Sequence, residues 1–208
     1  MKEKIKELDC LLAKKLLNYG FKRRKKNTYI KNVNEGVYGI NLADTKVKGQ
    51  EKIHIYVILT FNYERLNNLI MYLMNDYSYK GWESIAVNAI NIVPGNNAFG
   101  FYIEKNTNLE LIVDQTIEAF EKYGLHIFDD IDTCEKLQKK LYEDNKAIIN
   151  WLVFKQEWYY LALAIMLAND SVNNIIEKYY DEFNSTEETF AEFMERINNH
   201  EKIQEIIK

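Results

Sequence analysis

Large apolar residues alternate strictly in one stretch of this chain and recur at helical spacing almost everywhere else. Every second residue from 53 to 63 is large and apolar, and a period of two is typical of a β-strand with one buried face. Residues 29–33 and 37–43 alternate in the same way on either side of an Asn34-Glu35-Gly36 turn, which predicts a β-hairpin. The chain is therefore expected to build a sheet with one core face.

Helical periodicity precedes and interrupts these strands. Residues 2–19 carry a single apolar stripe, and Gly20 follows at the position of a left-handed C-cap, so we expect a first helix that ends there. Residues 64–75 return to helical spacing and predict a short helix. Two further strands are expected, joined by a Pro94-Gly95-Asn96-Asn97 turn: residues 84–93 and 98–104.

Beyond residue 104 every segment has a helical pattern. Capping-box spacings open helices at 107–110, 132–135 and 185–188. Gly124 is expected to end the first of these helices, and Asp132 to cap the second. A very apolar helix is predicted over 146–168 with a break near Phe154, and another helix over 171–183.

These patterns predict an α+β fold with an N-terminal helix, a mainly antiparallel sheet of about five strands and a helical C-terminal region. The expected organisation is an α+β sheet domain over 1–125 and a helical subdomain over 126–208 that packs against it. Because the chain holds only 8 glycines and 1 proline, no linker separates the two parts, and one compact unit is the alternative.

Charge is unevenly distributed along the chain. The first fifty residues hold 13 Lys or Arg and 5 acidic residues, whereas residues 104–208 hold 11 basic and 22 acidic residues. An acidic surface of this kind complements a cationic protein partner.

Five consecutive cations form the strongest local charge feature: Lys22, Arg23, Arg24, Lys25 and Lys26. Such runs bind phosphate backbones, so this candidate basic patch raises a nucleic-acid hypothesis. No recognition helix or RNA-binding aromatic pattern accompanies the run, and the formal net charge is −4. A solvated loop leading into the sheet is therefore the favoured interpretation.

No catalytic, metal-binding or cofactor motif is present. The chain has three histidines, His54, His126 and His200, and none belongs to a recognisable catalytic pattern. Acidic residues 129–132 lack the spacing of a calcium loop and are better explained by helix capping. Cys10 and Cys134 have neither zinc-site spacing nor a disulfide framework.

Polar side chains on the second face of the predicted sheet form the candidate partner or ligand surface: His54, Tyr56, Thr60 and Asn62. They alternate with the apolar set of the 53–63 strand and so point away from the core.

The N-terminal twenty residues are charged throughout, unlike a signal peptide, and the longest nearly unbroken apolar run, 158–168, is shorter than the roughly 20 residues that span a bilayer. We therefore expect a cytoplasmic protein with no membrane association. The abundance of Ile, Lys, Asn and Tyr indicates an AT-rich genome.

Two segments carry a family resemblance: Leu17-Asn18-Tyr19-Gly20-Phe21-Lys22-Arg23-Arg24-Lys25-Lys26-Asn27-Thr28-Tyr29 and Tyr123-Gly124-Leu125-His126-Ile127-Phe128-Asp129-Asp130-Ile131-Asp132-Thr133. With a helix before the first and strands between them, residues 3–142 resemble an uncharacterised bacterial family, a domain of unknown function. The resemblance implies a small cytoplasmic α+β protein, with some related members immunity-like. It supplies no catalytic residues, and this chain departs from it at His126-Ile127, at the 64–75 helix and in its long helical C-terminus.

Three functions follow as hypotheses. The first is a non-enzymatic protein-binding module, an immunity-like protein that binds a cationic bacterial toxin. The second is a nucleic-acid-binding protein that uses residues 22–26. The third is an enzyme of unknown class with a pocket between the sheet and the helices.

Overall fold

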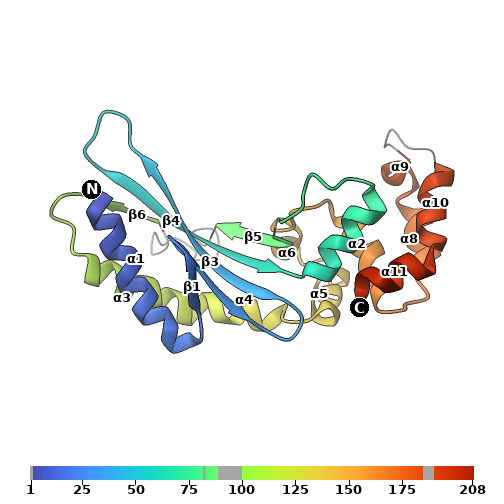
Figure 1. Cartoon of the computed structure of the whole chain (residues 1–208), viewed down its shortest axis with the longest axis horizontal. Coiled ribbons are helices and arrows are strands. Elements are labelled where there is room, and N and C mark those ends of the chain that lie inside the picture. The colour runs from blue at the N-terminus through green and yellow to red at the C-terminus, as the bar shows by residue number, and fades with distance from the viewer. Residues whose placement is uncertain (1, 82, 89–99, 185–189) are drawn as a thin grey trace. The chain divides into compact units, whose positions relative to one another are not determined.

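The computed structural model describes residues 2–81, 83–88, 100–184 and 190–208. It confirms the α+β fold, with an N-terminal helix, an antiparallel sheet and a helical C-terminal region (Figure 1). The chain divides into two units, the first comprising residues 1–61 and 86–130 and the second residues 62–85 and 131–208. The short helix inside the predicted sheet region therefore belongs with the C-terminal helices.

The first helix ends where the sequence predicts. Helix α1 runs over Lys2–Leu16 and is followed by a 3₁₀ turn, Leu17–Tyr19. Gly20 adopts a φ of 82°, and its backbone N–H donates to the carbonyl of Leu17. Glycine adopts this left-handed conformation without steric cost, which explains why the helix stops here.

The sheet has six strands among the described residues: β1 (Lys22–Lys25), β2 (Thr28–Asn32), β3 (Val37–Lys46), β4 (Ile53–Asn62), β5 (Ile85–Asn88) and β6 (Gly100–Ile103). The first five follow one another in space in chain order, and β6 pairs antiparallel with the first half of β4. The β2–β3 hairpin forms as predicted.

One strand more is present than expected because the basic segment is itself a strand. Residues Lys22–Lys25 pair antiparallel with β2 at one edge of the sheet. Edge strands tolerate a row of charged side chains, which also prevent pairing with other chains. The interpretation of this segment as a loop is therefore corrected. The expected turn at 94–97 lies outside the described residues.

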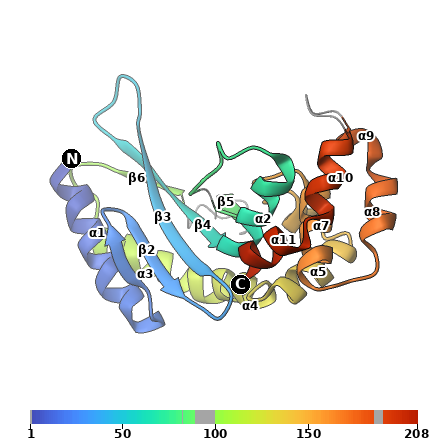
Figure 2. The same ribbon diagram turned by 45° about the vertical axis from the view of Figure 1, so that its right-hand side comes forward.

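Helices α1 and α3 cover the core face of the sheet in the first unit (Figures 1 and 2). Helix α3 runs over Leu109–Ala119, with Asn108 as its N-cap. Mainly apolar side chains from α1, β3, β4, α3 and the turn after α3 surround a small space, which is lined by Leu12, Leu16, Ile40, Leu42, Val57, Thr116, Ile117 and Phe120. The strict alternation in β3 and β4 thus supplies the sheet side of this core.

Gly124 does not end a helix. The chain passes from α3 through a π-helical turn, Phe120–Gly124, directly into α4, Leu125–Asp130. A Cβ on Gly124 would lie 2.6 Å from Cδ2 of Phe120, so glycine is required here for close packing and not for a left-handed turn. The sequence pattern of a glycine after an apolar helix does not distinguish these two causes.

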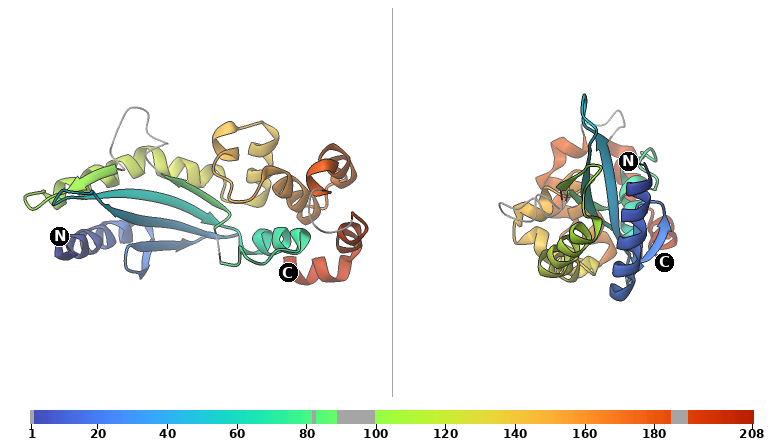
Figure 3. Two further views of the ribbon diagram at one scale, coloured as in Figure 1. Left: turned by 90° about the horizontal axis from the view of Figure 1, so that it is seen from above. Right: turned by 90° about the vertical axis from the view of Figure 1, so that its left-hand side faces the viewer.

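The second unit is built from helices: α2 (Glu64–Met74), α5 (Cys134–Tyr142), α6 (Lys146–Ile149), α7 (Gln156–Met166), α8 (Val172–Lys178), α9 (Tyr180–Phe183), α10 (Phe190–Asn198) and α11 (His200–Ile207). Those from α7 onward are orange to red in Figure 3. The predicted break near Phe154 separates α6 from α7.

Helix α7 forms the centre of the second unit. Seven of its residues are buried, as expected for a helix that is apolar on nearly all sides. The Trp158 ring packs on Phe183 at a centroid distance of 4.8 Å and edge-on against Phe193 at 6.0 Å. Helix α10 and helix α9 are thereby tied to α7.

The N-cap of α5 differs by one residue from the sequence-based expectation. Thr133, and not Asp132, caps α5, because its hydroxyl accepts from the backbone N–H of Lys136. Asp132 instead pairs with the Lys136 ammonium at 2.7 Å. The expected cap at 185–188 lies outside the described residues.

Within the described part of the chain, no helix is both long enough and apolar enough to cross a membrane.

Candidate functional site

Two of the predicted surface residues lie together on the second face of the sheet. The His54 and Tyr56 rings are 5.8 Å apart on β4, and Tyr102 of β6 stacks on His54 at 4.7 Å. The ammonium of Lys52 lies 4.8 Å from the Tyr102 ring centroid. Tyr102 is 51% exposed, so this cluster offers an aromatic surface with one cation.

Thr60 and Asn62 lie elsewhere and have local partners. Thr60 is buried, and its hydroxyl occupies the space that a Cβ on Gly39 would need, 2.2 Å away. The Asn62 amide oxygen accepts from Nδ2 of Asn67 at 3.0 Å, at the start of the second unit. Of the four predicted residues, the structure brings His54 and Tyr56 into one aromatic cluster, while Thr60 and Asn62 have other neighbours.

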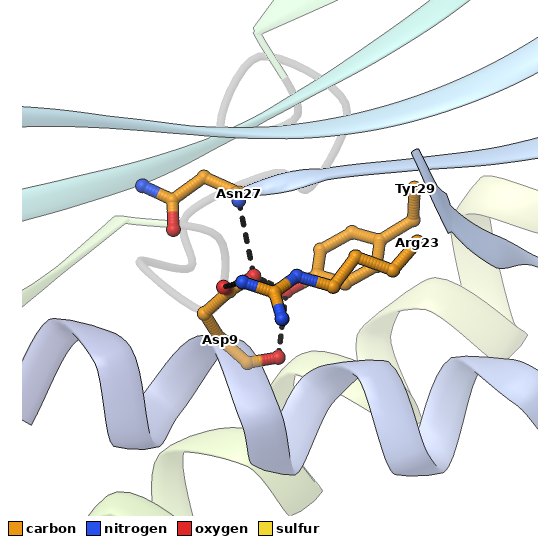
Figure 4. Close-up of polar contacts among 4 residues, drawn as sticks. All are labelled: Asp9, Arg23, Asn27 and Tyr29. Atoms are coloured by element: carbon orange, nitrogen blue, oxygen red, sulfur yellow. Dashed lines mark hydrogen bonds and ion pairs between the residues drawn. The ribbon is translucent and has the colours of Figure 1, made fainter. Parts of the chain in front are cut away.

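The carboxylate of Asp9 forms an ion pair with one of the five cations of the basic patch. Asp9 is fully buried in α1, and its carboxylate pairs with the guanidinium of Arg23 (Figure 4). The backbone N–H of Asn27 and the hydroxyl of Tyr29 donate to the same carboxylate, at 3.0 and 2.6 Å. Burial and the Asp9 hydrogen bond raise the pKa of Tyr29. Arg23 is thus part of the fold.

The side chain of Arg23 is itself 42% exposed, and the remaining four cations of the patch are exposed as well: Lys22, Arg24, Lys25 and Lys26. Lys22 pairs with Ile30 and Lys25 with Thr28, whereas Arg23 pairs with the buried Tyr29. Paired residues share a face of a sheet, so Lys22 and Lys25 lie on the second face and Arg23 on the core face.

The other two histidines lie on helices. His126 is an exposed residue of α4, and His200 is the exposed first residue of α11. Among the described residues no group of three His, Cys, Asp or Glu side chains could hold a metal ion. The hypothesis of an enzyme pocket between the sheet and the helices stays a prediction.

A groove of about 530 Å³ in the second unit brings aromatic, acidic and amide side chains together. Three tyrosines line it, Tyr142 at the end of α5, Tyr160 in α7 and Tyr179 after α8. We call it the tyrosine groove; its other lining residues are Leu141, Asp144, Gln156, Ser171, Asn174, Ile175 and Lys178.

Stacked rings and local hydrogen bonds organise the tyrosine groove. Tyr160 stacks with Tyr142 at a centroid distance of 5.6 Å and with Tyr179 at 5.9 Å. Its hydroxyl donates to the carbonyl of Leu141 at 2.9 Å. Burial raises the pKa of Tyr160, and the neighbouring Tyr179, Asp144 and Tyr142 raise it further. The central ring is therefore held in position, while Tyr142 stays 50% exposed.

Sequence reasoning missed this groove. Its three tyrosines come from α5, from α7 and from the turn after α8. No spacing rule links positions that only tertiary packing brings together. The aromatic cluster around Tyr160 was visible in the sequence, but at helical spacing such residues are more often part of a core.

The two units differ in charge. Residues of the first unit include 16 Lys or Arg and 13 Asp or Glu, and those of the second unit 11 and 18. The tyrosine groove thus belongs to an acidic unit, and the basic patch to a weakly basic one.

Comparisons of the chain with protein-family models, with curated proteins and with solved structures give no match. The geometry of the two units therefore carries the functional argument.

Proposed function

We propose that this protein is a non-enzymatic binding module for a basic protein, and that its role is immunity-like, the partner being a cationic toxin. The tyrosine groove in an acidic unit is the observation that supports this proposal. Tyrosine supplies a large contact area with a polar end at little entropic cost, and it is enriched among residues that dominate interface energies.

Exposed carboxylates on the C-terminal helices create a negative electrostatic field that would attract a basic partner. Glu177 on α8, Asp181 on α9, Glu195 on α10 and Glu201 on α11 are all exposed. Complementary charges of this kind increase the rate of association more than they increase affinity. The acidic helices would steer the partner, and the groove would anchor it.

Capture of a partner tests the proposal directly. Tagged protein expressed in its native host should retain a basic protein, and co-expression should neutralise a toxin encoded beside its gene. Replacing the four exposed acids of the C-terminal helices by lysine should slow association by about tenfold or more at low salt, with the difference shrinking as salt rises.

A charge-matched control distinguishes an effect of this surface on the association rate from an effect of the total charge of the protein. Lysine at four exposed acidic positions of the first unit changes the total charge equally: Glu3, Glu7, Glu104 and Glu118. Equal slowing by both variants, or no basic protein retained at all, would contradict the proposal.

Nucleic-acid binding is the second candidate, favoured by one observation. Lys22 and Lys25 share the second face of the sheet with the cluster of His54, Tyr56 and Tyr102. Cations combined with stacking platforms are typical of single-strand binding surfaces. Anisotropy of labelled oligonucleotides at graded salt should then detect binding that weakens when Lys22 and Lys25 become glutamine; unchanged affinity would exclude this use of the patch.

A further inference from the structure

We propose that the tyrosine groove binds a guanidinium group between its exposed ring and Asp144. The inference rests on the proposed function in one respect, namely that the guanidinium belongs to an arginine side chain of the basic partner. The site itself is defined by the groove, so it can be tested without any partner.

Asp144 supplies an unusual carboxylate. It is exposed, makes no ion pair with any residue that the structure describes, and lines the groove beside Tyr142 and Tyr160. It follows α5 directly in a left-handed conformation, with φ of 52°, and its N–H donates to the carbonyl of Leu141.

The position of Asp144 favours a cation for a second reason. The C-terminal end of a helix carries partial negative charge, so an acidic residue is electrostatically unfavourable there and a cation is favourable. Glycine or asparagine would adopt the same left-handed conformation without the added charge. A bound cation would be stabilised by both the carboxylate and the end of α5.

The rings of the groove suit a cation as well. The ammonium of Lys178 already lies 4.8 Å from the centroid of the Tyr179 ring, which shows that a tyrosine face in this groove accepts positive charge. Tyr160 stacks against both this ring and the ring of Tyr142. A second cation would therefore take the Tyr142 side, next to Asp144, away from the ring that Lys178 covers.

Guanidinium fits this arrangement better than ammonium. It is planar, stacks on aromatic rings, is weakly hydrated, and donates two parallel hydrogen bonds to a carboxylate. The amide oxygens of Gln156 and Asn174, which also line the groove, could accept its remaining N–H groups.

Titration with a small arginine probe tests the site in the full chain. N-acetyl-arginine amide should shift tyrosine fluorescence and the NMR signals of groove residues, and the neutral analogue N-acetyl-citrulline amide should not. Asp144→Asn, which retains the tolerance for a left-handed conformation, should weaken binding about tenfold. Asp170→Asn changes another exposed carboxylate of the same unit and should leave binding unchanged.

Tyr142→Ala provides a second variant, because this half-exposed ring can be removed without opening the core. It should weaken arginine binding several-fold with no change in the circular dichroism spectrum. Equal binding of arginine and citrulline probes, or equal binding by wild type and Asp144→Asn, would overturn the guanidinium site.

Partner binding distinguishes the two proposals. If a captured basic protein binds Asp144→Asn at least tenfold more weakly, its arginine occupies the groove. If it binds both forms equally, the arginine claim fails while the proposed function stands. If the arginine probe binds but no basic protein is captured, the proposed function fails and the groove is a site for free guanidinium compounds.

Discussion

Arg23 on strand β1 holds the carboxylate of Asp9, a residue of α1 that is fully buried. This ion pair attaches the edge strand of the sheet to the first helix. It also gives one member of the basic patch a structural role that its four neighbours in sequence do not share. Replacing Arg23 and its neighbour Arg24 one at a time therefore tests this structural role.

Arg23→Gln should lower the free energy of unfolding by about 2–3 kcal/mol, because it leaves a buried carboxylate without its cation. Arg24→Gln removes an exposed cation in the bulged part of the same strand and should change stability by less than about 0.5 kcal/mol. Urea unfolding followed by circular dichroism measures both. Similar losses for the two variants would show that Asp9 does not depend on Arg23.

The side chain of Thr60 occupies the space in which a side chain at position 39 would lie. A Cβ at position 39 would lie 2.2 Å from Oγ1 of Thr60, so Gly39→Ala should destabilise the fold by about 1–3 kcal/mol. Combining it with Thr60→Ala should recover about 1 kcal/mol or more relative to the sum of the single changes. Thr45→Ala, at an exposed position of β3, should instead be additive with Gly39→Ala. Additivity in both pairs would mean that Thr60 is not the packing neighbour.

Replacing Gly124 by alanine should destabilise the fold, although this change usually stabilises a helix. Alanine is favoured over glycine in a helix by about 1 kcal/mol. Here its Cβ would lie 2.6 Å from the Phe120 ring and 3.5 Å from Leu59, so Gly124→Ala should lower the melting temperature. Adding Phe120→Leu should make the alanine cost smaller, as thermal unfolding would show. A higher melting temperature for the single variant would contradict this account of the π-helical turn.

Stability should fall steeply in alkali. Burial raises the pKa of both Tyr29 and Tyr159 above that of tyrosine in the unfolded chain, which is about 10. Below pH 10 both states are protonated and the contribution of these residues is complete. Above it the unfolded state loses protons that the folded state retains, so each tyrosine costs about 1.4 kcal/mol per pH unit.

Tyrosinate absorbance and circular dichroism should therefore report ionisation of these two residues together with unfolding. Tyr29→Phe should reduce the pH dependence above pH 10, whereas Tyr77→Phe, at a residue that is 56% exposed, should not. Ionisation of all tyrosines before any loss of structure would refute the prediction.

Local patterns were sufficient to predict most elements but not the first strand. Alternation in residues 53–63 and 29–43 predicts β2, β3 and β4 because one side chain in two enters the core. Lys22–Lys25 has no apolar residue and therefore no such signal. It becomes a strand because the edge of β2 offers backbone hydrogen bonds, which are independent of side-chain pattern.

The candidate surface was predictable in part. The position of His54 and Tyr56 on the second face follows from the period of the strand, but their association with Tyr102 depends on the pairing of β4 with β6. The sequence showed aromatic residues around Tyr160 but gave no signal for the tyrosine groove, since its rings meet only through the packing of separate elements.

The sequence by itself determined most of the helices and strands and which of their faces are apolar, because those properties depend on neighbours within a few residues. Tertiary structure alone decided the roles of individual polar side chains. Among five adjacent cations, Arg23 differs from the rest because Asp9 is buried opposite it. Among fifteen tyrosines, three line a groove because α5, α7 and α8 pack together. Such roles depend on distances between residues that are far apart in the chain, and no local pattern encodes those distances.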